Sequence, residues 1–177
     1  DVDELRVSTI YVDEGMTMEG LRIARGARDR YTGIQRNPWC EIECGGHYAR
    51  AMSAYSLLLA ASGFDGNAAA GRLSLSPRMM QDDFKAFFSM GSCWGRLSQT
   101  RAANGQRNRI EVAHGVLELK ELALELPRTL PAEHSVTVTT SHGQPEVHKT
   151  VNGQTCTLVF EKPVILQAGE SLEVRIA

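Results

Sequence analysis

The chain has 177 residues, of which 42% are hydrophobic, and its formal net charge is −2. This length suits one domain or two small ones, and the hydrophobic fraction is sufficient for a buried core. The nearly balanced charge argues against nucleic acid or an anionic membrane as the main partner, and no apolar run reaches the roughly 18–20 residues of a membrane-spanning helix.

The first residues, Asp1 to Leu5, contain no initiating methionine and no secretory signal pattern. They read as the interior of a longer sequence, so we expect a fragment, a processed piece or an incompletely represented protein. The cysteines, which lack the spacing of a disulfide framework, favour a reduced, cytoplasmic setting. They are Cys40, Cys44, Cys93 and Cys156.

Cys40, Cys44 and His47 raise the question of a metal site. Structural zinc sites combine a short-spaced pair of ligands with a second pair further along the chain, and no second pair follows here. Buried structural thiols are therefore the better interpretation. The sequence predicts neither a metal nor a cofactor.

Two segments have the pattern of helices. Residues 16–31 combine an apolar stripe with arginines on the opposite face, which indicates a solvated helix. Residues 47–62 are apolar or small on most sides, so this second helix is expected to be buried and its tyrosines to lie in the core. Gly63 is a natural C-terminal stop.

From Arg72 onward the pattern changes to that of strands. Residues 82–90 suit either a short helix or a strand, and the Asn104–Gly105 pair is a hairpin turn signal. Alternating strands are predicted at 92–98, 109–112, 116–126, 135–140, 155–160 and 172–176, with turns between them that include Pro163. The predicted class is α+β, with helices in residues 1–100 and an antiparallel β tail in residues 101–177.

The stretch from Arg36 to Arg50 is the densest in groups that can contact a polar ligand. Pro38 favours an extended segment, in which Trp39, Glu41 and Glu43 share one face. Two glycines follow, and then His47, Tyr48 and Arg50 lie in the first turn of the next helix. An aromatic ring beside carboxylates and a guanidinium suits a sugar, because the sugar ring stacks and its hydroxyls need acceptors and donors.

The run from Arg36 to Tyr55, followed by residues 57–64, resembles the C-terminal part of glycoside hydrolase family 116, which includes bacterial β-glucosidases and the non-lysosomal glucosylceramidases. The likeness extends upstream through residues 26–33 and, more loosely, downstream to Trp94 and Gly95. It covers about the first hundred residues. It implies that the helices are the terminal helices of an (α/α)6 toroid.

The resemblance also implies the roles of individual residues. In the family, the nucleophile and the acid/base come from segments upstream of this motif, and neither segment is present in the chain. The matching positions contact the sugar: Glu41 and Arg50 are implied to hydrogen-bond its hydroxyls. We therefore predict no catalytic residue in this chain, a β-glucoside as the substrate, and the remaining polypeptide of the enzyme as the partner.

The remaining residues of the motif have structural alternatives. Glu43 suits a supporting role beside Arg50 or His47, Trp39 stacks on a ligand or packs in the core, and His47 contacts a ligand or a backbone group. Trp94 is expected to have a packing role.

A catalytic pair within the motif is a further possibility. On one face of a strand, the Cβ atoms of Glu41 and Glu43 would lie roughly 6–7 Å apart, which is compatible with the carboxyl separations of glycosidases. Neighbours on one strand, however, approach a glycosidic bond from the same side.

Two functions from different classes follow. The first is the C-terminal portion of a retaining β-glycosidase that supplies sugar-binding residues. The alternative is a non-catalytic carbohydrate-binding or assembly subunit, which must fold and bind alone. The apolar helix at 47–62 argues against this alternative, because two helices and a small sheet can hardly cover it.

Overall fold

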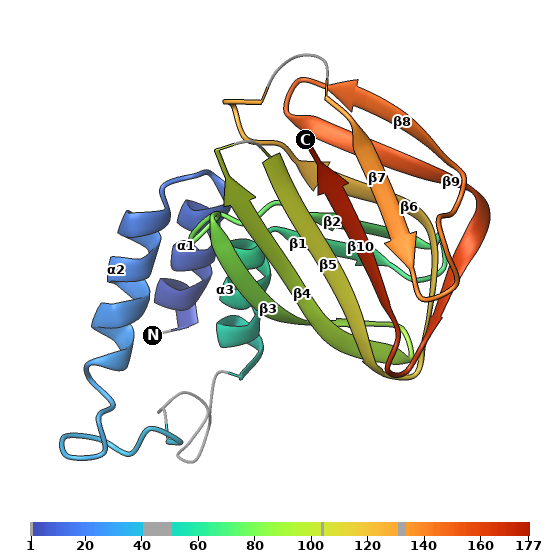
Figure 1. Cartoon of the computed structure of the whole chain (residues 1–177). Coiled ribbons are helices and arrows are strands. Elements are labelled where there is room, and N and C mark those ends of the chain that lie inside the picture. Colours follow the sequence, from blue (N-terminus) through green and yellow to red (C-terminus); the bar gives the residue numbers. More distant parts are fainter. Residues whose placement is uncertain (1, 41–50, 104, 131–133) are drawn as a thin grey trace. The chain divides into compact units, whose positions relative to one another are not determined.

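The structure, a computed structural model, describes residues 2–40, 51–103, 105–130 and 134–177 (Figure 1). The chain forms two compact units, residues 1–63 and 64–177. The first is helical and the second consists of two β-sheets, so the predicted α+β class is confirmed. The chain divides between Gly63 and Phe64 and not near residue 100, where Thr100 lies inside strand β4 (Cys93–Ala102).

The helical unit contains α1 (Val2–Asp13), α2 (Thr17–Arg28) and α3 (Ala51–Ser62), and α1 packs against both of the others. Gly20 of α2 permits the close approach of α1, since a Cβ at this position would lie 2.7 Å from the carbonyl oxygen of Ser8. The hydroxyl of Ser8 donates to the carbonyl of Gly20 at 2.6 Å. A small residue and a hydroxyl thus join the first two helices.

The helices differ from the prediction in two ways. α1 was not predicted, because its many β-branched residues have low intrinsic helix propensity, and tertiary packing decides its conformation. α2 is shorter than expected: it ends at Arg28 with Asp29 as its C-cap, and the Arg25 Nε donates to the Asp29 carboxylate at 2.9 Å. The expected apolar stripe is present, since Ala24 and Ala27 are buried.

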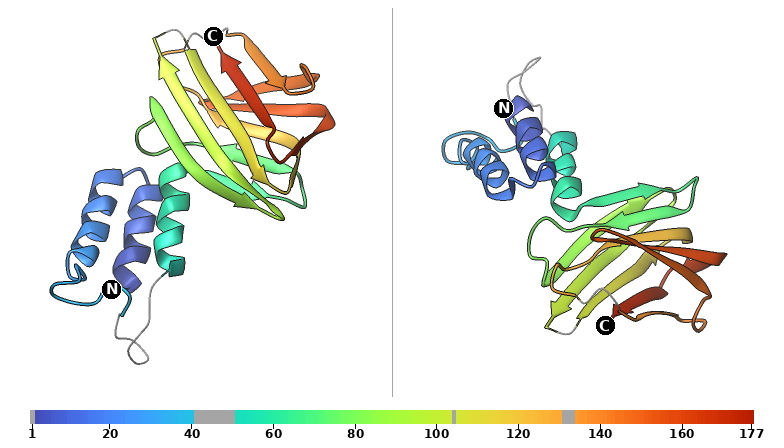
Figure 2. Two further views of the ribbon diagram at one scale, coloured as in Figure 1. Left: turned by 60° about the horizontal axis from the view of Figure 1, so that its bottom comes forward. Right: turned by 90° about the horizontal axis from the view of Figure 1, so that it is seen from above.

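The second unit is a two-layer sandwich of five-stranded sheets, which Figure 2 shows as facing layers. One sheet has the order β1 (Phe64–Asn67), β2 (Arg72–Leu75), β6 (Val116–Glu125), β9 (Thr155–Gln167) and β8 (Val147–Asn152). The other has the order β3 (Asp83–Met90), β4, β5 (Gly105–His114), β10 (Ser171–Ile176) and β7 (Val136–Thr140).

The predicted antiparallel tail is confirmed, since the strands that pair with one another within residues 101–177 are antiparallel. One parallel pair lies outside that prediction, because β2 precedes the predicted tail. β2 and β6 are parallel, while the other paired strands are antiparallel. A parallel pair needs a long crossover, and the meander β3–β4–β5 in the opposite sheet supplies it. Strand periodicity identifies strands but carries no information about such a crossover.

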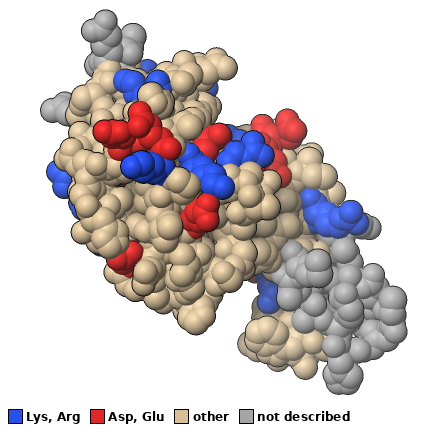
Figure 3. All heavy atoms as spheres, turned by 90° about the vertical axis from the view of Figure 1, so that its right-hand side faces the viewer, with Lys and Arg blue, Asp and Glu red and all other residues tan. Residues whose placement is uncertain are grey.

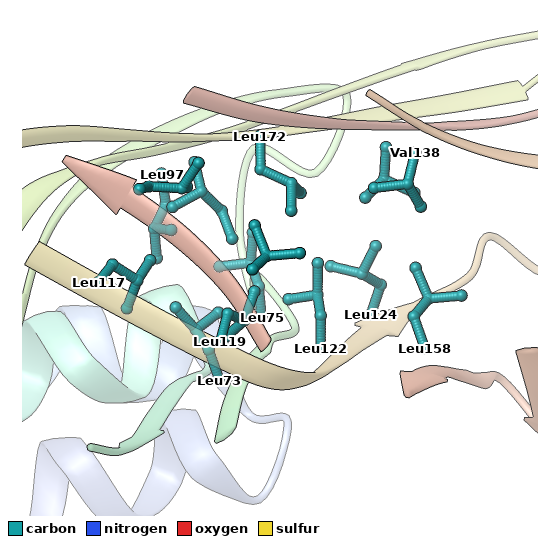
Figure 4. Close-up of a cluster of buried hydrophobic side chains, with 14 of the residues drawn as sticks. Leu73, Leu75, Leu97, Leu117, Leu119, Leu122, Leu124, Val138, Leu158 and Leu172 are labelled. Carbon is teal, nitrogen blue, oxygen red and sulfur yellow. The ribbon is translucent and has the colours of Figure 1, made fainter. Parts of the chain in front are cut away.

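A single hydrophobic cluster fills the space between the sheets. In Figure 4, side chains from both sheets point toward one another across this space, among them Leu97 and Leu172 from one sheet and Leu122 and Leu158 from the other. These four leucines are no more than 1% exposed. The period-two prediction for the last strands is confirmed at the residues that were predicted to face inward, since Leu158, Phe160, Leu172 and Val174 are buried.

Strand pairing decides one ambiguous segment and shows that one turn prediction, at Pro163, is wrong. Residues 83–90 form a strand with Phe84 and Phe88 buried. Pro163, which was predicted to mark a turn, lies within β9 next to the register shift between Leu119 and Glu121 of β6. A proline is tolerated there because an irregularity needs no regular ladder hydrogen bond.

The surface of the described residues is mixed in charge. On the face shown in Figure 3, basic and acidic side chains lie next to one another, in keeping with the net charge of −2. Within the described part of the chain, no helix is both long and apolar enough to cross a membrane.

Candidate functional site

The predicted sugar-contacting motif lies between α2 and α3. Of its five candidate residues, the structure describes Trp39 alone; Glu41, Glu43, His47 and Arg50 lie outside the described residues. The geometry of the site is therefore built from the loop that leads into the motif and from the helix that follows it.

Trp39 lies in a tight turn that presents its indole to solvent. The Cys40 N–H donates to the Asn37 carbonyl at 3.1 Å, which closes a β-turn, and the Trp39 N–H donates to the Asn37 side-chain oxygen at 2.9 Å. Asn at the first position and Pro38 at the second are the residues that such a turn favours. The indole is 74% exposed, so packing in the core of the described structure is not its role.

The preceding loop is attached to the end of α2. The Arg36 guanidinium lies 5.6 Å from the centroid of the Tyr31 ring, at the distance of a cation–π contact. Tyr31 is 7% exposed. The Gly33 N–H donates to the Arg36 carbonyl at 2.9 Å, with Gly33 at a φ of 88°, where glycine is favoured. These contacts hold the loop between Tyr31 and Arg36, which joins α2 to the turn that carries Trp39.

Helix α3 confirms the predicted helix over Ala51–Ser62. The hydroxyls of Thr9 and Ser56 are 3.0 Å apart, and Leu57 packs on the small core of the helical unit. Tyr55 and Leu58 are 39% and 37% exposed. The expectation that the helix tyrosines lie in the core is therefore wrong for Tyr55 in the described structure.

Two carboxyl groups that interact, those of Glu146 and Glu161, both line a cavity of about 620 Å³. The hydrogen bond with Glu161 raises the pKa of Glu146 above its ordinary value, and His148 opposes this shift.

No group of three or more His, Cys, Asp or Glu side chains in the described part of the chain could hold a metal ion. Cys44 and His47, which raised this question, lie outside it. Burial raises the pKa of the Cys93 and Cys156 thiols, so both are protonated, structural groups at neutral pH.

A row of aromatic rings on the outer face of the second sheet was not predicted as a site. Trp94 stacks with His114, with centroids 5.8 Å apart and planes at 19°, and lies 6.2 Å from Phe87. Trp94 and Phe87 are each 45% exposed. Trp94 therefore packs against Phe87 and His114 on the surface of the sheet and not in the core. Phe87 and Trp94 line a groove of about 640 Å³, which we call the β3–β5 groove; its charged lining residues are Lys85, Arg96, Glu111 and Glu170.

No protein-family model matches the chain. A function inferred from the motif between Arg36 and Tyr55 therefore depends on the order of its residues and on the geometry around them.

Proposed function

We propose that the chain is the C-terminal portion of a retaining β-glycosidase that resembles glycoside hydrolase family 116. In this proposal the chain supplies groups that hold the sugar, and the nucleophile and the acid/base lie on polypeptide outside this sequence. The observation that carries it is the residue order from Arg36 to Tyr55, which combines aromatic, acidic and basic groups in one short segment.

The described neighbourhood supports this proposal. The turn at Asn37–Cys40 presents Trp39 to solvent immediately before Glu41. An exposed indole offers an apolar face on which the C–H groups of a pyranose or an aglycone can stack. An exposed tryptophan next to acidic residues is the arrangement expected at the entrance of a sugar subsite.

The composition of α3 supports a larger helical assembly around it. α3 carries no charged residue, and Tyr55 and Leu58 on its surface are exposed in the described structure. A helix that is apolar on all sides is normally enclosed by other helices. The proposed (α/α)6 toroid would provide this enclosure.

The chemistry assigned to the two principal residues follows from their side chains. The Glu41 carboxylate accepts hydrogen bonds from two hydroxyls, and the Arg50 guanidinium donates in a fixed fork. Such contacts accelerate hydrolysis if they strengthen as the sugar ring distorts toward the transition state. Glu43 and His47 are proposed to orient these two groups.

The test begins with native mass spectrometry of the purified protein, compared with the denatured mass. A larger polypeptide that travels with the chain is expected, and the assembly should hydrolyse an aryl β-glucoside. In that assembly, Glu41→Gln and Arg50→Lys should each lower kcat/KM at least tenfold, with an unchanged melting temperature. Each removes a charged or bidentate hydrogen bond worth about 1.5–3 kcal/mol.

Glu14→Gln is the matched control, because Glu14 is an exposed carboxylate beyond the end of α1. It should leave turnover unchanged. Wild-type turnover in both motif variants would contradict the assignment of Glu41 and Arg50. A monomeric chain with no companion polypeptide would favour the alternative, a carbohydrate-binding or assembly subunit.

A further inference from the structure

We propose that the β3–β5 groove is a second carbohydrate site, separate from the Trp39 loop, and that it binds successive pyranose rings of a neutral β-linked oligosaccharide. The site lies entirely within the sheet unit. It does not depend on the β-glycosidase assignment, since each of its groups belongs to the described residues of that unit.

The rings come from three adjacent strands. Phe87 lies on β3, Trp94 on β4 and His114 on β5, and neighbouring ring centroids are 6.2 and 5.8 Å apart. Phe87 and Trp94 line the groove, whereas His114 stacks on Trp94 and supports its ring. A β-glucopyranose has two apolar C–H faces, so the exposed parts of Phe87 and Trp94 offer a surface on which such rings can stack.

A β-bulge creates the row. Trp94 pairs with His114 and Gly95 pairs with Val112, so that Ala113 is an extra residue in β5. Val112 is buried, whereas Ala113 and His114 are both exposed. The extra residue thus returns His114 to the outer face beside Trp94. Bulges recur next to functional sites because they redirect side chains in this way.

Gly95 is required by the same bulge. A Cβ built on Gly95 would lie 1.9 Å from the carbonyl oxygen of Glu111. Any side chain here would push β4 and β5 apart and would separate Trp94 from its neighbours. A glycine at position 95 therefore lets β4 and β5 approach closely, which keeps the aromatic rings next to one another.

The charged side chains that line the groove comprise equal numbers of basic and acidic groups. The Arg96 Nε donates to the Glu111 carboxylate at 2.8 Å, Lys85 pairs with Asp83 at 3.3 Å, and Glu170 lies 2.8 Å from His142. Lys85 and Arg96 are thus offset by Glu111 and Glu170.

An anion or a cation finds no excess of opposite charge in this groove. A neutral polyol, in contrast, finds both donors and acceptors for its hydroxyls. The volume of about 640 Å³ lies within the roughly 300–1,000 Å³ typical of small-molecule sites. Aromatic rings together with a balanced set of donors and acceptors favour a sugar over a charged metabolite.

The experiment is isothermal titration calorimetry of the full chain with cellotetraose, a neutral β-linked tetrasaccharide. We expect binding that weakens about tenfold in Trp94→Ala and in Phe87→Ala, because each loses an aromatic contact. Ile165→Ala is the matched control, since Ile165 is an apolar residue that is 54% exposed on the other sheet. Its affinity should equal that of the wild type, and the melting temperature of each variant reports its folding.

The chain contains two tryptophans, Trp39 and Trp94, so fluorescence separates the two candidate sites. In Trp39→Phe, the emission of Trp94 should still change as cellotetraose is added. If binding is lost in Trp39→Phe but unchanged in Trp94→Ala, the sugar binds at the loop, which overturns the groove proposal and supports the proposed function. Absence of binding by the wild type also overturns the groove proposal, whatever the assembly does with an aryl β-glucoside.

Discussion

A chain of buried amides in the sandwich offers a quantitative test of the structure. Gln99, Gln106 and Asn108 are 1%, 3% and 2% exposed. The Asn108 amide nitrogen donates to Gln99 Oε1 at 2.9 Å, and Gln106 Nε2 donates to Asn108 Oδ1 at 2.7 Å. Arg101 Nε donates to Gln106 Oε1 at 2.8 Å, which connects the amides to a cation. Buried amides are tolerated only when each polar atom has a partner.

Asn108→Leu should remove about 2–4 kcal/mol of stability. Gln99 Oε1 loses its partner, and an unsatisfied buried acceptor costs about 1–3 kcal/mol. Gln106 Nε2 loses one hydrogen bond, worth about 1 kcal/mol, but keeps its bond to the Glu125 carbonyl at 3.0 Å. The sum of these two terms is the predicted loss.

The double variant Gln99→Leu/Asn108→Leu distinguishes this explanation from simple loss of packing. Each single variant leaves one buried group unsatisfied, at about 1–3 kcal/mol, and the double variant leaves neither the Gln99 acceptor nor the Asn108 donor unsatisfied. The double variant should therefore lose at least about 2 kcal/mol less than the sum of the single variants. The assay is urea unfolding followed by circular dichroism, with free energies obtained by linear extrapolation.

Thr100→Leu provides the control for the assay, because Thr100 lies on the exposed face of β4. It should change the free energy of unfolding by less than about 0.5 kcal/mol. Additive losses in the double variant, or a neutral Asn108→Leu, would refute the connected amide network.

Two further predictions concern the sheets. Leu158→Ala should cost about 2–5 kcal/mol because Leu158 is fully buried, whereas Val159→Ala on the opposite face of β9, where Val159 is 41% exposed, should cost much less; equal losses in urea unfolding would contradict the assigned faces. Burial alone would raise the pKa of Glu173, but hydrogen bonds from Arg107 and Arg175 outweigh it and lower this pKa below its usual value. Because the pKa is lower in the folded state, Glu173 stabilises the fold at pH values above the pKa of about 4.3 in the unfolded chain. This stabilisation is lost as the pH falls through the folded-state pKa. Glu173→Gln should therefore be less stable than the wild type at pH 7 and equally stable at strongly acidic pH; a stability difference independent of pH would refute the ion-pair origin.

The helices show how far local pattern predicts structure. The small and apolar residues of α3 predict a helix irrespective of its partners, and it forms over Ala51–Ser62. α1 could not be predicted in this way, because its β-branched residues disfavour a helix locally. Its conformation depends on contacts with Gly20 and Ser56 of the other two helices.

The two candidate sites also differ in how far local sequence pattern predicts them. The sugar-binding prediction for Glu41 and Arg50 comes from a short contiguous motif, and it stays a prediction because these residues lie outside the described part of the chain. The aromatic row could not be predicted, since Phe87 and Trp94 come from neighbouring strands β3 and β4 but His114 comes from β5, further along the chain. A bulge in β5, which no sequence pattern announced, brings the last of these rings beside the second.

The sequence by itself determined the α+β class, most strand positions and their buried faces. These features depend on interactions between residues a few positions apart, which periodicity records. The tertiary structure alone decided the parallel β2–β6 pair, the division at Gly63 and the exposure of Trp94. Each of these features depends on contacts between segments that are distant in sequence. Such contacts include hydrogen bonds between strands of one sheet and packing between the sheets, which local sequence does not encode.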